Sequence, residues 1–201
     1  MREYTIARIS GQPDWNAIPT LQVDVHNWLD PVDVATTAQI CYDENGLYVH
    51  MRSREANIRA EERAPLSMVC NDSCMEFFFR PDENDPRYFN FEMNPLGNTY
   101  IGFGYGRGQS SRLAPKQEED MMQKTCRTTD DGWEIFYTIP VSFLQIFFPG
   151  YELTAGKKIF ANCFKCGDLT VQKHYLSWNP GSSADPDFHR PCDFGEMTLG
   201  A

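Results

Sequence analysis

The sequence predicts an all-β protein, an antiparallel β-sandwich with long loops and one or two short helices. Short apolar runs alternate with turn residues at fairly regular spacing, which is the pattern of a sandwich. Aromatic residues make up 13% of the chain, and they favour pleated sheet over helix. With 201 residues and no recognisable linker or repeat, we expect a single domain over residues 1–201.

The first predicted strands form a hairpin. Residues 38–42 and 47–51 are apolar runs that flank Asp43-Glu44-Asn45-Gly46. Asn-Gly tolerates the positive φ angles of a tight turn. A short continuous apolar run at 74–79 then predicts a central strand.

Residues 88–94 alternate with a period of two, so they predict a strand with two distinct faces. One face carries Phe89, Phe91 and Met93, and the other carries Tyr88, Asn90, Glu92 and Asn94. The next strand, 99–107, alternates glycine with larger residues at Gly102, Gly104 and Gly106. Glycine in a strand indicates close approach of backbone or ligand.

The second half of the chain predicts three more strands and one short helix. The strands are 132–139, ended by Pro140, then 158–165 and 195–199. Ser142 is the expected cap of a helix over 143–148. Residues 113–124 are polar and predict a mobile loop.

The net charge of −10 argues against nucleic-acid or anionic-membrane partners, because both require a basic face. No apolar run approaches the roughly 18 residues of a spanning helix, and the N-terminus has no apolar signal region. Seven cysteines, odd in number and poorly spaced for disulfides, predict free thiols in a reducing compartment. We therefore expect a cytoplasmic protein, or a secreted one if a leader was removed.

A segment rich in Pro, Ser, Gly and Asp, residues 174–195, carries Trp178. Because loops are exposed, an aromatic ring in one suits the flat apolar face of a sugar. The alternative is that Trp178 fills one end of the core.

The order of these motifs resembles the family 9 carbohydrate-binding modules, and more closely their family 9-like bacterial relatives. The resemblance runs over about 180 residues and rests on an ordered set of short pieces. They are Asp14-Trp15 with Ile18-Pro19, the hairpin, Asp72-Ser73-Cys74-Met75-Glu76, Asn90 to Gly97, Gly132-Trp133-Glu134 to Pro140, Ala161-Asn162 to Lys165, Trp178-Asn179-Pro180, and His189 to Gly195. The resemblance implies an immunoglobulin-like or DOMON-like sandwich that binds sugar without catalysis, in carbohydrate catabolism.

The sequence departs from the family at one aromatic position. Known members clamp a terminal sugar between two Trp rings, and one ring precedes the Asp-Ser-x-x-Glu element. Here residues 67–71 contain no aromatic, so only Trp178 maps to the clamp. This favours a one-sided platform for a small sugar or a glycan chain end, associated at most with a glycoside hydrolase.

Polar groups beside the aromatic face would bind vicinal hydroxyls, and charged groups form the stronger hydrogen bonds. The candidates are Trp178, Glu76, Asn94, Arg112, Lys165, His174 and Asn179. Structural alternatives stay open: Glu76 paired with Arg80, Asn94 shaping the turn before Gly97, Arg112 solvated in a loop, and His174 bound to backbone carbonyls.

Other chemistries are less well supported, so we expect no catalytic residue, metal ligand or cofactor. Cys163-Phe164-Lys165-Cys166 with His174 and His189 lacks the two tight ligand pairs of structural zinc. Its strand-like flanks do not suit a redox motif. Asp82-Glu83-Asn84-Asp85 could hold structural calcium, although a solvated turn fits better.

Three rival functions remain. A domain that kept the fold for a protein partner would explain the missing aromatic. A glycoside hydrolase would need two of the carboxylates Asp72, Glu76, Glu92 and Glu134 at a fixed separation. A haem-binding DOMON domain would use Met68 or Met75 with His174.

Overall fold

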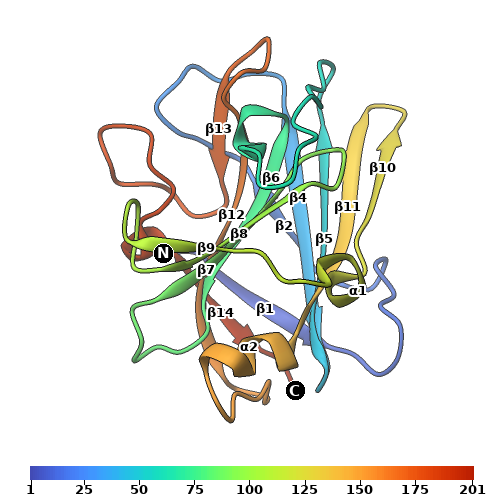
Figure 1. Ribbon diagram of the computed structural model, residues 1–201, viewed down its shortest axis with the longest axis vertical. Coiled ribbons are helices and arrows are strands. Elements are labelled where there is room, and N and C mark those ends of the chain that lie inside the picture. The colour runs from blue at the N-terminus through green and yellow to red at the C-terminus, as the bar shows by residue number, and fades with distance from the viewer.

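The computed structural model describes residues 1–201 and contains two packed sheets with two short helices. Figure 1 shows the strands running through the body of the molecule, with α2 (Val141–Phe147) at one end and α1 (Glu118–Met122) at one side. No helix has the length and apolar character needed to cross a membrane.

The first sheet is built around β12 (Lys158–Gly167). Its strands follow the order β9 (Ser110–Leu113), β8 (Thr99–Gly104), β7 (Tyr88–Met93), β6 (Cys74–Arg80), β12 and β14 (Gly195–Leu199). At one end of β12, β13 (His174–Ser177) pairs with it and also with β3 (Val25–His26).

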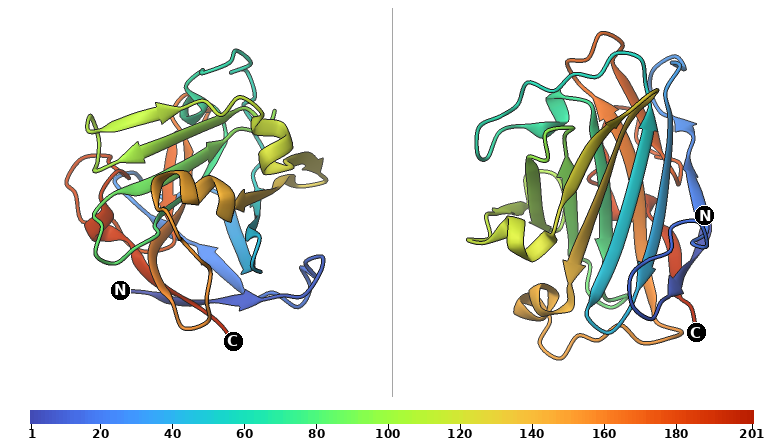
Figure 2. Two further views of the ribbon diagram at one scale, coloured as in Figure 1. Left: turned by 60° about the horizontal axis from the view of Figure 1, so that its bottom comes forward. Right: turned by 90° about the vertical axis from the view of Figure 1, so that its right-hand side faces the viewer.

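The second sheet follows the order β10 (Thr125–Thr129), β11 (Gly132–Pro140), β5 (Gly46–Arg54) and β4 (Ala35–Tyr42), with β2 (Thr20–Val23) beside β4. The right-hand view of Figure 2 shows this sheet stacked against the first. The sandwich is therefore confirmed.

One detail of the predicted sandwich is wrong, because the sheet is mixed rather than wholly antiparallel. Strand β1 (Glu3–Arg8) pairs parallel with both β14 and β4. It joins the two sheets into one hydrogen-bonded network.

The core lies between the sheets and comprises one cluster of 33 buried residues. Phe89, Phe91 and Met93 belong to it, as the period of two in β7 predicts. The opposite face of the first sheet points away from this core. Smaller buried clusters lie on that outer face, around Phe78, Tyr88 and Phe164 and around Cys74 and Cys166.

Most predicted elements are present. The hairpin forms between β4 and β5, with Tyr42 opposite Leu47. Asp43 closes its turn by accepting hydrogen bonds from the backbone N–H groups of Asn45 and Gly46. The strands predicted at 74–79, 132–139, 158–165 and 195–199 correspond to β6, β11, β12 and β14.

Three local predictions are wrong. The helix α2 begins after Pro140, and no side chain caps it, so Ser142 is not the cap. Residues 113–124, expected as a loop, contain α1. Part of the loop-like segment 174–195 is a strand, β13, which brings Trp178 to the core.

Candidate functional site

A cavity of about 290 Å³ lies on the outer face of the first sheet. Glu76 of β6, Glu92 of β7 and Cys166 of β12 line it from the sheet. Loops supply the remaining walls, from segments that include Trp28, Met68, Cys70, Arg107 and the stretch Pro186-Asp187-Phe188-His189. Its volume is near the lower end of ordinary small-molecule sites, which begin at roughly 300 Å³.

Two buried carboxylates line the cavity side by side. Glu76 and Glu92 are direct cross-strand partners, and they are 3% and 5% exposed. Their hydrogen bonds within the protein come from uncharged groups. The Cys166 thiol donates to Glu76 at 3.0 Å, and the Asn90 amide donates to Glu92 at 2.7 Å. No salt bridge reaches either residue, so neither carboxylate has a positively charged partner.

Burial sets the protonation of this pair. It raises the pKa of Glu76 to about 7. Burial and the neighbouring Glu76 together raise the pKa of Glu92 well above its usual value. Two like charges opposite each other in a sheet repel, and they repel more strongly away from water. The pair therefore holds at least one proton at neutral pH.

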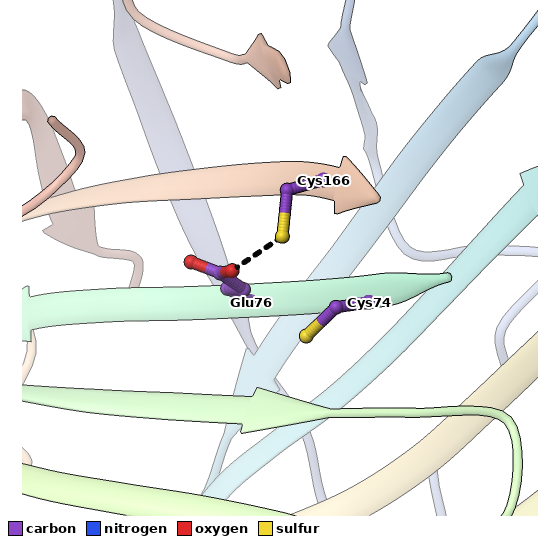
Figure 3. Close-up of side chains that lie close together, drawn as sticks. All are labelled: Cys74, Glu76 and Cys166. Carbon is purple, nitrogen blue, oxygen red and sulfur yellow. Dashed lines mark hydrogen bonds between the residues drawn. The ribbon is translucent and has the colours of Figure 1, made fainter. Parts of the chain in front are cut away.

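Thiols surround Glu76. Cys74 lies opposite Cys166 across β6 and β12, and Figure 3 shows Glu76 beside both. The Cys74, Glu76 and Cys166 ligand atoms lie within 4.8 Å of one another, so these residues could hold a soft metal ion. Burial raises the pKa of the Cys74 thiol to about 12, so without a cation the thiol stays protonated.

This group differs from the zinc set that the CxxC motif suggested. Residues three apart in a strand point to opposite faces, so Cys163 lies in the core while Cys166 lines the cavity. The partner of Cys166 is Cys74, 92 positions away in the sequence, which the motif cannot reveal.

Aromatic rings form the walls of the cavity. Trp28 lies against Tyr175 and Phe188, with ring centroids 5.6 and 5.4 Å apart. Tyr100 lines the cavity from β8, where it is the strand partner of Glu92. The Trp28 Nε1 atom donates to the backbone oxygen of Ser183 at 2.8 Å, which fixes its ring to the loop that carries Phe188. Trp28 also has a positive φ of 61°, which is uncommon for a bulky residue and marks a constrained position.

Polar contacts close the rim. The exposed Arg107 pairs with Asp187 at 2.9 Å and joins the β8–β9 turn to the loop of Phe188. His189 contacts the hydroxyl of Tyr88 at 2.8 Å. Burial lowers the pKa of His189 to about 4, so this imidazole is neutral at pH 7 and adds no positive charge.

Of the seven residues predicted to bind sugar, only Glu76 lines the cavity. Trp178 lies in the core instead. It is 4% exposed, makes an edge contact with Tyr4, and packs so closely on Gly195 that an added Cβ there would be 2.5 Å from its ring. Its face is not available to a ligand, and the core alternative describes its position.

Lys165 and His174 also face the core, on the side of the sheet opposite Glu76. The Lys165 ammonium is 3.2 Å from Glu55 and donates to His174 Nε2 at 3.0 Å. His174 Nδ1 lies 2.7 Å from the backbone oxygen of Gln172, as the structural alternative predicted. Burial and the neighbouring Lys165 lower the pKa of His174 to about 4.

Asn94 and Asn179 organise backbone. Asn94 accepts hydrogen bonds from the N–H groups of Leu96 and Asn98, which shapes the turn, and donates to Asp72. Asn179 binds the backbone of Arg2 and Asp193. Neither lines the cavity.

Arg112 supports the cavity from behind. Its guanidinium lies 4.1 Å from the centre of the Tyr100 ring and donates to the backbone oxygens of Leu66 and Ser67. It therefore holds Tyr100 and the loop before Met68 in place without lining the cavity itself.

Sequence reasoning placed Glu92 on the polar face of its strand and considered it only as a possible catalytic carboxylate. It missed the aromatic walls, Trp28, Tyr100, Tyr175 and Phe188. The sequence pattern of β8 could have identified Tyr100, because its side chain alternates with those of the core-facing Ile101 and Phe103 and so points to the outer face. The other three rings come from segments without a periodic pattern.

The remaining metal and carboxylate candidates have partners within the protein. In the acidic turn, Asp82 accepts from the backbone of Asn84, and Asp85 pairs with Arg87. Asp72 accepts from Arg59 and from the backbone of Glu61 and Glu62. Glu134 contacts His50 and Arg127 on the second sheet. Glu76 and Glu92 are thus the carboxylates of this set that share the cavity.

The sequence comparison decides the family. The model for carbohydrate-binding family 9 matches residues 12–199. The chain belongs to carbohydrate-binding family 9. A search among curated proteins finds no significant match.

Solved structures agree with membership in this family of sugar-binding modules. A "putative carbohydrate-binding protein" from Bacteroides uniformis ATCC 8492 is 27% identical, with a TM-score of 0.86, over 98% of this chain and 99% of that one. A family 9 module from Caldicellulosiruptor kristjanssonii in complex with glucose has a TM-score of 0.71 at 12% identity, over 100% and 97% of the two chains. The cellotriose complex of a family 9 module from the same organism has a TM-score of 0.70 at 11% identity, over 99% and 94%.

Proposed function

We propose that the chain binds one sugar ring, as a small sugar or the end of a glycan, in the cavity on the outer face of the first sheet. Rings of Trp28, Tyr100, Tyr175 and Phe188 pack on the C–H groups of the sugar. Glu76 and Glu92 take part in hydrogen bonds with its hydroxyls. Sugar binding needs both an apolar face and fixed polar groups, because desolvated hydroxyls must regain their hydrogen bonds.

One observation carries the proposal. Aromatic walls and two buried carboxylates without a charged partner meet in one cavity of a family 9 fold. Solved family 9 modules in complex with glucose and with cellotriose support a sugar as the ligand. The cavity of about 290 Å³ suits a single ring better than a long chain.

The proposal assigns the aromatic face to Trp28 and its neighbours rather than to Trp178. Trp28 is half-buried and lines the cavity, whereas Trp178 packs in the core. Met68 lies at the cavity edge, in the segment where the sequence lacks the aromatic of better-known relatives.

The carboxylate pair favours binding over hydrolysis. A glycosidase of the usual kind needs one carboxylate ionised as nucleophile or base and one protonated as acid. Here burial raises the pKa of Glu76 to about 7 and the pKa of Glu92 well above its usual value, so neither carboxylate is held fully ionised at neutral pH. A role in carbohydrate catabolism, a cytoplasmic location and an additional protein partner stay predictions.

Isothermal calorimetry with a panel of mono- and oligosaccharides tests the proposal. The decisive variant is Trp28→Ala, which should weaken binding by about tenfold or more, since aromatic anchors commonly contribute above 1.4 kcal/mol. Trp15→Ala is the matched control, because Trp15 is also half-buried but packs on His50 and Phe136 of the second sheet. Equal affinity of both variants and the wild type would refute the assignment.

A further inference from the structure

The charge of the cavity is unusual for a site that binds a neutral sugar. Four carboxylates line it, Glu76, Glu92, Asp168 and Asp187. The lining contains one positively charged side chain, Arg107, which is exposed and paired with Asp187. Arg112 lies behind Tyr100 and is bound to backbone oxygens.

The deepest carboxylates have no positive partner. Lys165 lies on the neighbouring strand, but its ammonium points to Glu55 in the core. No salt bridge reaches Glu76 or Glu92, and Arg107, the one cation in the cavity lining, is paired with Asp187. An ionised carboxylate buried without a positive partner is costly, so a ligand that brings a positive charge would stabilise the ionised form of the pair.

The walls around these carboxylates suit such a charge. Cations bind over the faces of Trp, Tyr and Phe rings, most strongly where water is excluded. Trp28, Tyr100, Tyr175 and Phe188 surround the carboxylates, and the Tyr175 hydroxyl already donates to Asp168. Aromatic rings with carboxylates beneath them form a recurrent recognition site for organic ammonium groups.

Building on the proposed function, we propose that the preferred ligand is an amino sugar, a hexose carrying a free, protonated amine. The ammonium group lies between Glu76 and Glu92, and the ring packs on the aromatic walls. The site then discriminates against N-acetylated sugars, whose amide is neutral and bulkier, and against uronic acids, whose carboxylate is repelled.

Matched sugar pairs test this by calorimetry at pH 6.5 in the presence of EDTA: glucose with glucosamine, galactose with galactosamine, and mannose with mannosamine. For at least one pair, we expect the amine to bind about tenfold more tightly, the size of one desolvated charge contact. N-acetylglucosamine, glucuronic acid and ethanolamine complete the panel.

A charge-neutral variant gives the decisive comparison. Glu92→Gln should reduce the preference for the amine over its neutral partner to within about threefold. Asp131→Asn is the matched control, because it removes the same charge from an exposed carboxylate that pairs with Arg52 away from the cavity. It should retain the preference.

Proton release supplies an independent readout. An ammonium between the two carboxylates stabilises their ionised forms, so binding should expel part of a proton, measured in phosphate and HEPES. A neutral sugar should expel none. Charged and titratable groups surround the pair on every packed element. They are Cys74 on β6, Tyr88 on β7, Tyr100 on β8, Arg112 on β9, Lys165 and Cys166 on β12, Tyr175 on β13, and Cys70, Arg107, Asp168, Asp187 and His189 in the loops.

The outcomes separate the two proposals. A neutral sugar that binds as tightly as its amine overturns the amino-sugar assignment and leaves sugar binding intact. Ethanolamine binding as tightly as glucosamine, or no binding by any member of the panel, overturns both. Without EDTA, a thermal shift with zinc chloride that exceeds the glucosamine shift and disappears in Cys74→Ser would assign the carboxylates to a metal and overturn the amine.

Discussion

The ammonium of Lys165 lies 3.2 Å from a carboxylate oxygen of Glu55 inside the core, and both side chains are almost completely buried. Glu55 also accepts hydrogen bonds from Ser73 and from the indole of Trp133. Burial favours the neutral acid, but Lys165 and these two donors outweigh it and lower the pKa of Glu55. This ion pair lies on the face of the sheet opposite the cavity, so its role is structural.

Replacing Lys165 should therefore lower the unfolding free energy of the protein. Lys165→Met leaves Glu55 charged and buried without its partner, and we expect a loss of about 3–5 kcal/mol in unfolding free energy. Urea denaturation at pH 7 measures it. Lys116→Met is the control, since the Lys116 side chain is exposed. A loss below about 1 kcal/mol would contradict a buried pair.

Trp178→Ala should reduce stability rather than remove a ligand contact. The variant leaves a large hole between Tyr4 and Gly195, and such substitutions cost about 3–5 kcal/mol. Thermal unfolding measures the effect, and calorimetry on the folded fraction measures sugar affinity. A large loss of affinity with an unchanged melting temperature would return Trp178 to the binding site.

Gly195→Ala tests the packing of Trp178 on Gly195 by a change in the glycine. An added Cβ would be 2.5 Å from the Trp178 ring and 2.9 Å from the Arg2 backbone oxygen, so the strand or the ring must shift. Overpacking of this kind costs about 1–3 kcal/mol. Gly106→Ala is the comparison, because a Cβ added there would be 3.4 Å from its nearest neighbour, the backbone oxygen of His189. Equal melting temperatures for the two variants would refute the close contact.

Glu76→Gln should stabilise the unliganded protein at alkaline pH. The pKa of Glu76 is about 7 when folded, above its usual 4.5, so its ionised form weakens the fold above pH 7 and the penalty fades as pH falls towards 4.5. Glutamine carries no such penalty, so we expect a gain of about 1–3 kcal/mol at pH 8 and little at pH 5. Urea denaturation at both pH values provides the measurement, and a gain independent of pH would exclude this cause.

His174 should stabilise the fold at neutral pH and lose this effect in acid. Its pKa is about 4 when folded, below the usual 6.5, so its contribution is complete above pH 6.5 and is lost as pH falls towards 4. The stability difference between the wild type and His174→Gln should shrink over this interval. Unfolding curves from pH 7.5 to 4.5 report it, and a constant difference would show that the imidazole does not stay neutral.

Much of the fold could be predicted because it follows from local chemistry. Period-two alternation identified both faces of β7, and the turn residues 43–46 identified the hairpin, although neither Asn45 nor Gly46 has a positive φ. Strands β1 and β13 were missed, since the first mixes charged, polar and apolar residues without a clear period and the second lies in a loop-like composition.

The candidate site could be predicted only where the signal was local. Glu76 was a candidate because it ends the Asp72-Ser73-Cys74-Met75-Glu76 element of the family resemblance, and alternation placed Glu92 on the polar face of its strand. Alternation cannot show which face of a strand meets the core when both faces are buried, as in β12. There Lys165 points to Glu55 and Cys166 points to the cavity.

The sequence by itself determined the strand pattern, the family and the acidic, aromatic character of the chain. Tertiary structure alone decided which ring is buried and which rings form the site. Tyr100 and Tyr175 belong to strands β8 and β13, and they meet Trp28 and Phe188 because the loops of these two rings fold over the outer face of the same sheet. Such contacts depend on the paths of loops, and no local periodicity encodes them.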